Sequence, residues 1–214
     1  ILNFCVESTN AQSGAVFLRD PAAPDTLVAH GVYGLFPPLK PAPDKVFARH
    51  QYLAERLKKE PVRMGEGIVG KVAEQARPLL IAEARLDPMI PPSANQIVQI
   101  ETLMAAPLLV RGELVGVIVL VNRRTENDPF RPDDLDLLCA LADQAAITVN
   151  LVRVYSELSE KQRLEQELEV AHQFQEMLLP REAPIVEGLE IAGYSAPAQE
   201  VGGDYYDFFD VDAE

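Results

Sequence analysis

The sequence predicts an α+β fold, in which helices flank an antiparallel sheet and one long helix follows it. Two observations carry this prediction. Two β-rich runs, 102–110 and 113–122, flank Arg111-Gly112, and such a pair around a Gly-containing turn is typical of a β-hairpin. No Gly or Pro occurs between Pro132 and Pro180, so about 45 consecutive residues can form a single helix.

Shorter elements precede the hairpin. Residues 1–6 have the sequence of a helix interior, and apolar runs at 15–19 and 26–32, joined by a Pro-containing turn, predict two strands. The proline-rich residues 36–43 predict a rigid connector, because each proline fixes its backbone angle φ. Asp44 can then cap a helix that runs to about residue 59.

The glycines between Gly65 and Gly70 predict a tight turn into a short helix, in which Val72 and Ala76 face inward. A buried strand is expected at 79–81. The spacing Gly-x-Gly-x-x-Gly also occurs in loops that bind phosphate, but there it follows a strand of a βαβ unit. Because this stretch does not follow such a strand, we interpret it as a structural turn.

The long helix is expected to begin at Pro132, since proline fits a first helical turn and the nearby Asp133 and Asp134 complement the positive end of the helix dipole. An isolated helix of this length needs a partner to cover its apolar side chains. We therefore predict that residues 132–179 pair as a coiled coil in a homodimer. The alternative is a solvated, charged spacer helix.

Two heptad frames run along this helix. Leu151, Val154 and Leu158 follow the first frame. The second frame is followed by Leu164, Leu168, Ala171 and Leu178, with Gln175 at one core position. The frames are offset by three residues near Lys161, and such an offset overwinds a coiled coil locally. We expect this seam to have two alternative registers. After Pro180, residues 189–194 and 204–209 predict two strands of a further domain.

Composition and charge exclude several classes of protein. The net charge is −14, and it is uneven: residues 1–149 carry 15 basic and 18 acidic side chains, whereas residues 150–214 carry 4 and 15. No basic cluster exists for a phosphate backbone, so nucleic-acid binding is not expected. Apolar stretches such as 114–121 are far shorter than the ~20 residues of a membrane span.

The only cysteines, Cys5 and Cys139, do not form a metal or disulfide pattern, which favours a cytoplasmic protein. The chain begins without an initiator Met or a signal peptide, so we expect it to be a piece of a longer protein.

The C-terminal residues 200–214 concentrate negative charge. Six of these fifteen residues are acidic and none is basic: Glu200, Asp204, Asp207, Asp210, Asp212 and Glu214. Oxygen ligands alone favour hard cations such as Mg²⁺, Mn²⁺ or Ca²⁺. The other interpretation is a polar edge strand that faces water.

The residues around this acidic stretch resemble the start of a bacterial PPM-type, stage II sporulation protein E-like serine/threonine phosphatase domain. The similar elements are Gln-x-x-Leu-Leu-Pro at 175–180 and Pro-Ala-x-x-Val-Gly-Gly-Asp-x-x-Asp at 197–207. The resemblance implies that Asp204 is a ligand of a dinuclear Mn²⁺/Mg²⁺ site and that Asp207 matches the second acid of the motif. The implied substrate is a phosphorylated anti-sigma-factor antagonist of a partner-switching pathway.

The resemblance also implies further metal-binding motifs that lie after Glu214. We therefore expect residues 1–214 to be inactive by themselves and the parent protein to be an Mn/Mg-dependent phosphatase. Two metal ions can activate a water molecule and neutralise charge on a phosphoryl group, without a protein nucleophile.

The first 155 residues resemble a GAF domain, a small-molecule sensory module, whose first helix is expected to be truncated at its start. The similar stretches are 65–72, 77–81, 106–122 and 130–138. Asn122, Arg123, Phe130 and Asp134 partly match the Asn-Lys-Phe-Asp-Glu signature of cyclic-nucleotide-binding GAF domains, with Arg in place of Lys and Leu135 in place of Glu. In that family these residues brace the fold, so the signature does not identify the ligand, which stays unknown.

Other single residues are given ordinary roles. His30, His50 and His172 are far apart in the sequence, which does not favour a His metal site, and His172 is expected on the helix surface. Cys139 is interpreted as a small core residue beside Leu138. Four aromatic residues can either line a pocket or pack in the core: Tyr33, Phe36, Phe47 and Tyr52.

The sequence thus predicts a GAF-like sensory domain at 1–150, a signalling helix at 132–179 that overlaps its end, and the incomplete start of a phosphatase domain at 180–214. The expected function is sensory and regulatory control of a phosphatase that acts on an anti-sigma-factor antagonist. Two alternatives stay open: a stand-alone small-molecule sensor, and a purely structural dimerisation module.

Overall fold

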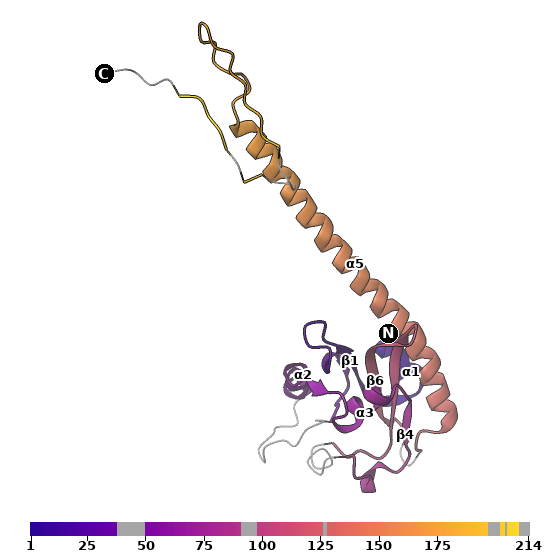
Figure 1. Cartoon of the computed structure of the whole chain (residues 1–214). Coiled ribbons are helices and arrows are strands. Elements are labelled where there is room, and N and C mark those ends of the chain that lie inside the picture. The colour runs from indigo at the N-terminus through magenta and orange to yellow at the C-terminus, as the bar shows by residue number, and fades with distance from the viewer. Residues whose placement is uncertain (38–49, 91–97, 126–127, 197–201, 204, 210–214) are drawn as a thin grey trace. The chain divides into compact units, whose positions relative to one another are not determined.

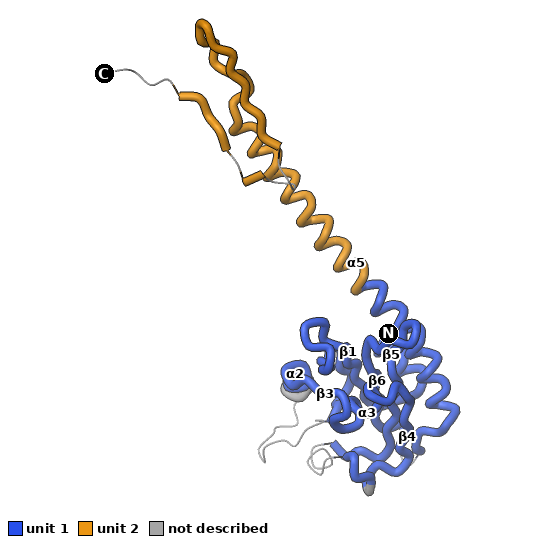
Figure 2. The backbone as a smooth tube through the Cα atoms, viewed as in Figure 1, with its two compact units in different colours: residues 1–152 blue, residues 153–214 orange. Residues whose placement is uncertain are grey.

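The structure is a computed structural model that describes residues 1–37, 50–90, 98–125, 128–196, 202–203 and 205–209. The chain divides into two compact units, residues 1–152 and residues 153–214 (Figure 2). The capping residue Asp44, most of the proline-rich connector, and Phe47 lie outside the described residues.

The first unit is built on a six-stranded antiparallel sheet with the strand order β3-β2-β1-β6-β5-β4 (Figure 1). The strands are β1 Ala11–Arg19, β2 Thr26–Tyr33, β3 Val62–Arg63, β4 Leu79–Ile81, β5 Leu103–Val110 and β6 Glu113–Arg123. The strands predicted within residues 1–122 are all present, and the short edge strand β3 is additional. The α+β prediction with an antiparallel sheet is confirmed.

The helices of this unit are α1 Leu2–Ser8, α2 His50–Lys59, α3 Gly67–Gln75, a short 3₁₀ helix at Ala84–Leu86, and the first part of α5 Pro132–Leu178. Figure 1 shows α1 and α5 on one face of the sheet and α2 and α3 on the other. The predicted long helix is confirmed, and it begins at the proline that the sequence indicated.

The central hairpin joins β5 and β6 through Arg111 and Gly112, which have φ of 52° and 86°. Two consecutive residues with positive φ twist a tight turn in the same sense as the strands that it connects. Glycine adopts this backbone without strain, whereas a side chain at Gly112 would be disfavoured. The hairpin prediction is therefore confirmed in its turn chemistry as well as in its strands.

Alternate residues of the strands point to opposite faces and build two separate cores. The core under α2 and α3 contains Phe17, Leu103 and Val119, together with Phe36, whose ring centroid lies 6.4 Å from that of Phe17. The core under α1 and α5 includes Met104, Ile118, Leu120 and Phe130. Phe36 thus belongs to the core rather than to a pocket wall.

The glycine-rich stretch is a turn, as predicted. Gly65 has a φ of 79°, its N–H donates to the carbonyl of Gly70 at 2.8 Å, and a Cβ at Gly70 would collide with the carbonyl of Arg63. In the helix that follows, Val72 is buried as expected. The inward prediction for Ala76 is wrong: it is exposed and left-handed, with a φ of 50°, because the helix ends at this residue.

The helix α5 changes character along its length. Its buried residues all lie near its start, at Leu138, Ala142, Ala145 and Ala146, where they pack in the second core. From Leu151 onward the apolar side chains of the two heptad frames are exposed, between 42% and 69% for the leucines at 151, 158, 164, 168 and 178. One helix is therefore a core element at one end and an uncovered element at the other.

By length and composition α5 is also able to cross a membrane, because it contains an 18-residue window with a mean hydropathy of 1.5. Only 22% of that window is buried. A core helix of a soluble protein passes the same test, and residues of α5 do pack against the sheet. The expectation of no membrane span therefore stays a prediction.

The second unit contains little regular structure after α5. The predicted strand at 189–194 is not formed: Leu189 makes only one isolated bridge, with Val186, and Tyr194 is 89% exposed. Residues 205–209 are also not a strand. The physical reason is that a strand is stable only when other strands pair with it and its apolar face is covered.

Candidate functional site

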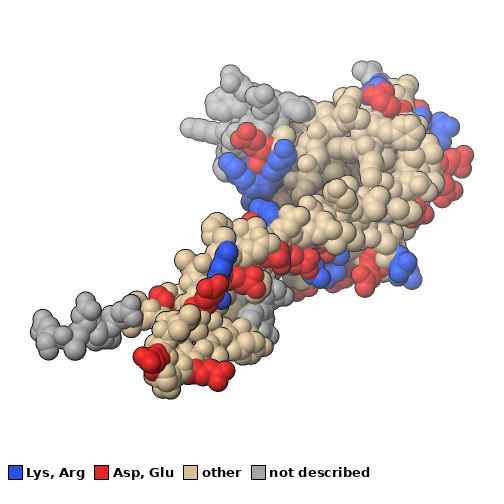
Figure 3. All heavy atoms as spheres, turned by 90° about the horizontal axis from the view of Figure 1, so that it is seen from above, with Lys and Arg blue, Asp and Glu red and all other residues tan. Residues whose placement is uncertain are grey.

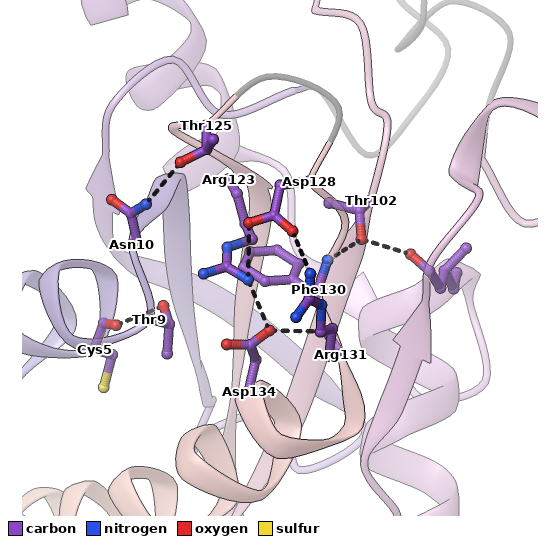
Figure 4. A network of polar contacts seen from close by, with 11 residues as sticks. Cys5, Thr9, Asn10, Thr102, Arg123, Thr125, Asp128, Phe130, Arg131 and Asp134 are labelled. Carbon is purple, nitrogen blue, oxygen red and sulfur yellow. Dashed lines mark hydrogen bonds and ion pairs between the residues drawn. The ribbon is translucent and has the colours of Figure 1, made fainter.

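The polar groups of the first unit concentrate where β6 ends and α5 begins. We call this group the β6–α5 junction; it consists of Thr102, Asn122, Arg123, Asp128 and Asp134. Figure 4 shows Arg123 between the two aspartates, with Thr102 close to the backbone of Phe130. All five side chains come from segments that converge at one end of the sheet.

Asn122 closes the end of β6. It has a φ of 53°, a left-handed backbone that asparagine tolerates better than most residues. Its buried side chain accepts a hydrogen bond from the backbone N–H of Glu101 at 2.8 Å and donates to the carbonyl of Gln99 at 2.7 Å. Asn122 therefore holds the segment that enters β5 against the end of β6.

Arg123 joins the sheet to the start of α5. Its Nη1 lies 3.2 Å from Asp134 Oδ2 and 3.3 Å from Asp128 Oδ2. Asp134 also accepts a hydrogen bond from the backbone N–H of Arg131 at 2.8 Å. An acid in the first helical turn that bonds the residue preceding the helix is half of a capping box, so Asp134 fixes the helix start as well as Arg123.

Thr102 connects three segments, and the sequence reasoning did not single it out. Its hydroxyl donates to the carbonyl of Ile81 at 3.1 Å and accepts the backbone N–H of Phe130 at 3.1 Å. The side chain is 2% exposed. A threonine within an apolar run is the only sequence signal for this role, and many strand threonines share it.

The predicted role of Asn122, Arg123, Phe130 and Asp134 as a brace agrees with these contacts. Phe130 is 1% exposed and packs in the core under α5. A cavity of about 480 Å³ lies beside the brace. The described residues that line it are Ala82, Glu83, Arg85, Glu101, Thr102, Arg123, Thr125, Asp128 and Pro129.

A second polar group ties α1 to the sheet. Arg124 donates to the carboxylate of Glu7 through Nη2 at 2.6 Å and through Nη1 at 3.0 Å, and the hydroxyl of Tyr33 lies 3.2 Å from Glu7. The bonds from Arg124 hold the pKa of Glu7 below its usual value. Two consecutive arginines at the end of β6 thus form ion pairs with the two helices on the same face of the sheet: Arg124 with Glu7 of α1 and Arg123 with Asp134 of α5.

Cys5 and Cys139 belong to the core under α1 and α5. Cys5 is fully buried and Cys139 is half-buried. Burial raises the pKa of both thiols, and for Cys139 the carboxylates of Asp136 and Asp143 raise it further. A raised pKa leaves little reactive thiolate, which agrees with the interpretation of Cys139 as a small core residue.

The structure describes the side chains of two of the three histidines, His30 and His172. His30 is exposed on β2, and the side chain of His50 is outside the described part, as is that of Tyr52. His172, predicted on the helix surface, is half-buried: its Nε2 lies 3.4 Å from Glu176, and its Nδ1 has no partner among the residues described. It lines a cavity of about 290 Å³ with Gln175, Glu176, Leu179 and Ser195.

The second unit brings together two motifs that are 27 residues apart. The side-chain amide of Gln175 donates to the carbonyl of Gly202 at 2.6 Å, and its oxygen accepts the N–H of Gly202 at 2.8 Å. Gln175 is the first residue of Gln-x-x-Leu-Leu-Pro, and Gly202 is the first glycine of Gly-Gly-Asp. A paired amide contact of this kind fixes the backbone of the loop against the helix.

The predicted metal site at Asp204 and Asp207 stays a prediction, because only Asp207 is described. Asp204 lies outside the described residues. Asp207 is exposed, and its two oxygens accept the hydroxyl of Tyr205 at 2.9 Å and the N–H of Phe208 at 2.8 Å. Within the described ranges, no group of three or more His, Cys, Asp or Glu side chains has the arrangement to hold a metal ion.

Comparison with known proteins identifies the first unit. The family model described as "GAF domain" matches residues 1–149. The GAF domain of a Coxiella burnetii phosphoenolpyruvate-protein phosphotransferase superposes with a TM-score of 0.57 at 20% identity, covering 73% of this chain and 82% of that chain. No curated protein sequence matches the chain.

Two further solved structures have the same fold. For the GAF-B domain of DevS from Mycobacterium smegmatis the TM-score is 0.52 at 19% identity, and the match covers 73% of this chain and 93% of that chain. For a GAF/HD domain protein from Geobacter sulfurreducens it is 0.54 at 14% identity, covering 72% and 90%. At such identities the likeness shows the fold alone.

Proposed function

Because the chain belongs to the GAF domain family, we propose that it is the sensory and regulatory region of a cytoplasmic, metal-dependent protein serine/threonine phosphatase. The GAF domain is a sensory and regulatory fold, and it occupies residues 1–149. The phosphatase part of the proposal rests on residues 175–209. The substrate proposed from the resemblance is a phosphorylated anti-sigma-factor antagonist.

One observation supports the phosphatase assignment more than any other: the paired hydrogen bonds between Gln175 and the backbone of Gly202. The two motifs that resemble a phosphatase domain are separate in sequence, and a chance resemblance gives no reason for them to meet. In addition, the ring of Tyr206 lies where a side chain at Gly193 would collide with it, so the two segments after α5 also contact each other.

The metal ions belong to the complete phosphatase in this proposal. The described acids do not fit a metal site: Asp207 uses both oxygens for neighbouring residues, and no suitable cluster occurs among the residues described. Asp204 is proposed as one ligand, with the remaining ligands after Glu214. Residues 1–214 by themselves are then inactive.

In this proposal a homodimer paired through α5 connects the sensory domain with the phosphatase. In the exposed part of α5, the ion pairs join residues three or four apart on the same helix, such as Arg153 to Glu157 at 3.4 Å and Arg163 to Glu160 at 2.9 Å. These pairs stabilise the helix but leave its leucines uncovered. We propose that a second copy covers them and that a signal in residues 1–149 changes the register of the pair.

The test uses the parent protein extended beyond Glu214, a phosphoserine-containing protein substrate and Mn²⁺. We expect metal-dependent release of phosphate that falls at least about a hundredfold in Asp204→Asn, because a metal ligand is lost. Glu187→Gln is the matched control, since Glu187 is an exposed acid of the same unit, and it should keep full activity. Equal activity in both variants, or turnover by residues 1–214 alone, would contradict the proposal.

Lys161→Leu tests the register. A leucine at the break between the heptad frames should lock one register, so that the phosphatase of the parent protein becomes constitutively high or low. Unchanged regulation in an unchanged dimer excludes the switch. A parent without phosphatase activity that still binds a small molecule would instead favour a stand-alone sensor, and one that only dimerises would favour a structural module.

A further inference from the structure

Within the first unit, α5 has two faces that differ in what covers them. One face packs against the sheet, and its buried residues are Leu138, Ala142, Ala145 and Ala146. Another face is exposed although it is apolar, with Leu137 at 39% and Ile147 at 57%. An uncovered apolar face of α5 thus already exists inside the sensory domain, and not only beyond it.

This exposed face continues the first heptad frame toward the start of the helix. Its members, counted back from Leu151 in steps of four and three residues, are all exposed: Ile147, Gln144, Ala140 and Leu137. We call residues 137, 140, 144, 147, 151, 154 and 158 the outward seam, in which 137, 144, 151 and 158 are a positions and the others are d positions. The buried residues of α5 fall at b, c and f, which lie on the side of the helix away from a and d. The seam therefore faces away from the sheet.

The residues beside the outward seam favour a second copy in parallel orientation. Two g positions carry acids, Asp143 and Glu157, and the e positions that follow them carry neutral hydrogen-bond donors, Thr148 and Gln162. In a parallel pair each g residue lies beside the following e residue of the other helix, so each carboxylate meets a donor. In an antiparallel pair the g rows face each other, which brings carboxylates together.

Gln144 is the one polar member of the outward seam. When two parallel helices pair in register, the Gln144 side chains of both copies lie in the same layer, where each amide can donate to the other. A shift by one heptad would place Gln144 against Leu137 or Leu151 and leave its amide buried without a partner, which is costly. A single polar side chain at a core position is known to specify register in this way.

We propose that a second copy of this chain covers the outward seam as a parallel, in-register partner, and that Gln144 specifies the register. The proposal rests on the homodimer of the proposed function and deepens it, because the pairing begins at Leu137, within the sensory domain. Gln144 then holds the register up to Leu158, and the register change proposed above is confined to the residues that follow.

A four-stranded bundle is the competing assembly. Leucine at a with β-branched residues at d, as in Leu151 and Val154, favours more than two strands. Such a bundle would also bury more of the e and g rows, and burying the carboxylates of Asp143 and Glu157 is unfavourable. A dimer leaves these acids at its solvent-exposed rim, so two strands fit the flanking residues better.

Cysteine cross-linking of residues 1–214 tests the orientation and the register. Leu137→Cys and Leu151→Cys, each made with Cys139→Ser, should both form a covalent dimer when an oxidant is added, because equivalent residues meet only in a parallel, in-register pair. An antiparallel pair brings at most one residue opposite its own copy. Val152→Cys is the matched control: Val152 is 61% exposed but lies at a b position, and it should not cross-link.

Sedimentation equilibrium tests the seam itself. Ile147→Glu should weaken the dimer at least about tenfold, because it places a charge in the seam, whereas Val152→Glu should not. Gln144→Leu should tighten association about tenfold or more and lower the cross-link yield at residue 137, because the register is no longer specified. An unchanged yield would contradict the role of Gln144.

Three results would overturn the proposal: a monomer at all concentrations, a tetramer, and cross-linking at residue 151 without cross-linking at residue 137. The last result would leave the homodimer of the proposed function intact and exclude only a seam that begins within the sensory domain. None of these measurements involves phosphatase activity, so their failure is distinct from failure of the phosphatase assignment.

Discussion

The two units of the chain use their apolar residues in opposite ways. In residues 1–152 the strands and helices bury two cores, so that the side chains of Phe17, Leu120 and Leu138 are inaccessible. Among the described residues of 153–214 most large apolar side chains are exposed, as with Leu158 at 51% and Ile185 at 103%. The described apolar residues of the first unit are covered largely by that unit itself, whereas the second unit presents an apolar surface of the kind that marks interaction sites in other proteins.

The ion pairs of the two units also differ, in whether they join distant segments of the chain. On the face shown in Figure 3, basic and acidic side chains of the molecule are interspersed and do not form one basic field. In the first unit several ion pairs join distant segments, such as Glu7 with Arg124. The pairs on the exposed part of α5 are all within the helix. Ion pairs therefore support tertiary contacts in the first unit, whereas on the exposed part of α5 they support the helix itself.

The strongest test of this comparison is a pair of substitutions on one helix. Leu138→Ala should lower the free energy of unfolding of the first unit by about 2–5 kcal/mol, because it empties a core position. Leu158→Ala, twenty residues later in the second unit and 51% exposed, should change it by less than about 0.5 kcal/mol at concentrations where the chain is monomeric. Urea unfolding followed by far-ultraviolet circular dichroism measures both, since the chain contains no tryptophan.

The second test compares substitutions of two hydrogen-bonding amide side chains, one in each unit. Asn122→Ala should destabilise the first unit by about 1–3 kcal/mol, since it removes two part-buried hydrogen bonds, one from the N–H of Glu101 and one to the carbonyl of Gln99. Gln175→Ala should leave that transition unchanged and only increase hydrogen exchange around Gly202. A global loss of stability in the Gln175 variant would show that the units are not independent.

The exposed ion pair of Glu7 predicts a smaller, pH-dependent effect. Arg124 lowers the pKa of Glu7 in the folded state, so the stabilisation is present above the unfolded pKa, roughly pH 4–5, and is lost as the pH falls through the folded value. Glu7→Gln should therefore be less stable than the native chain at pH 7 and equal to it near pH 3. Parallel unfolding curves at every pH would contradict this, and Glu113→Gln is the control.

The smallest effect is expected on α5. Arg163→Ala removes pairs with Glu160 at 2.9 Å and with Glu167 at 3.7 Å, each worth about 0.3–0.5 kcal/mol on an exposed helix. Helicity measured at 222 nm should fall slightly, and the difference should vanish at high salt because screening removes the attraction. A large or salt-independent loss would mean that Arg163 has contacts beyond its own helix.

Most of the first unit was predictable from sequence because local patterns and tertiary contacts agree there. The apolar, β-rich runs of β5 and β6, the Arg111-Gly112 turn and the helix start at Pro132 each have a local cause that the fold retains. The brace residues were identified by resemblance. Thr102 was missed because its importance lies in two backbone groups from distant segments, Ile81 and Phe130, which no local pattern records.

The errors have physical reasons as well. The inward prediction for Ala76 continued the helical stripe past the point where the helix ends. The strand predicted at 189–194 followed its apolar pattern, but a strand also needs partners, which the pattern does not reveal. The exposed heptad residues show the same distinction, since an apolar pattern predicts that side chains will be buried but does not identify the surface that buries them.

The continuity of α5 has a consequence for any domain attached to its end. An α-helix turns 100° per residue, so whatever follows Leu178 inherits an angular phase from the residues that are locked into the core at Leu138 and Ala146. Removing seven residues between Val152 and Leu178 would change this phase by only about 20°, whereas removing two would rotate it by more than half a turn. The helix thus transmits an angle, and insertions in multiples of seven are the length changes that it can accept.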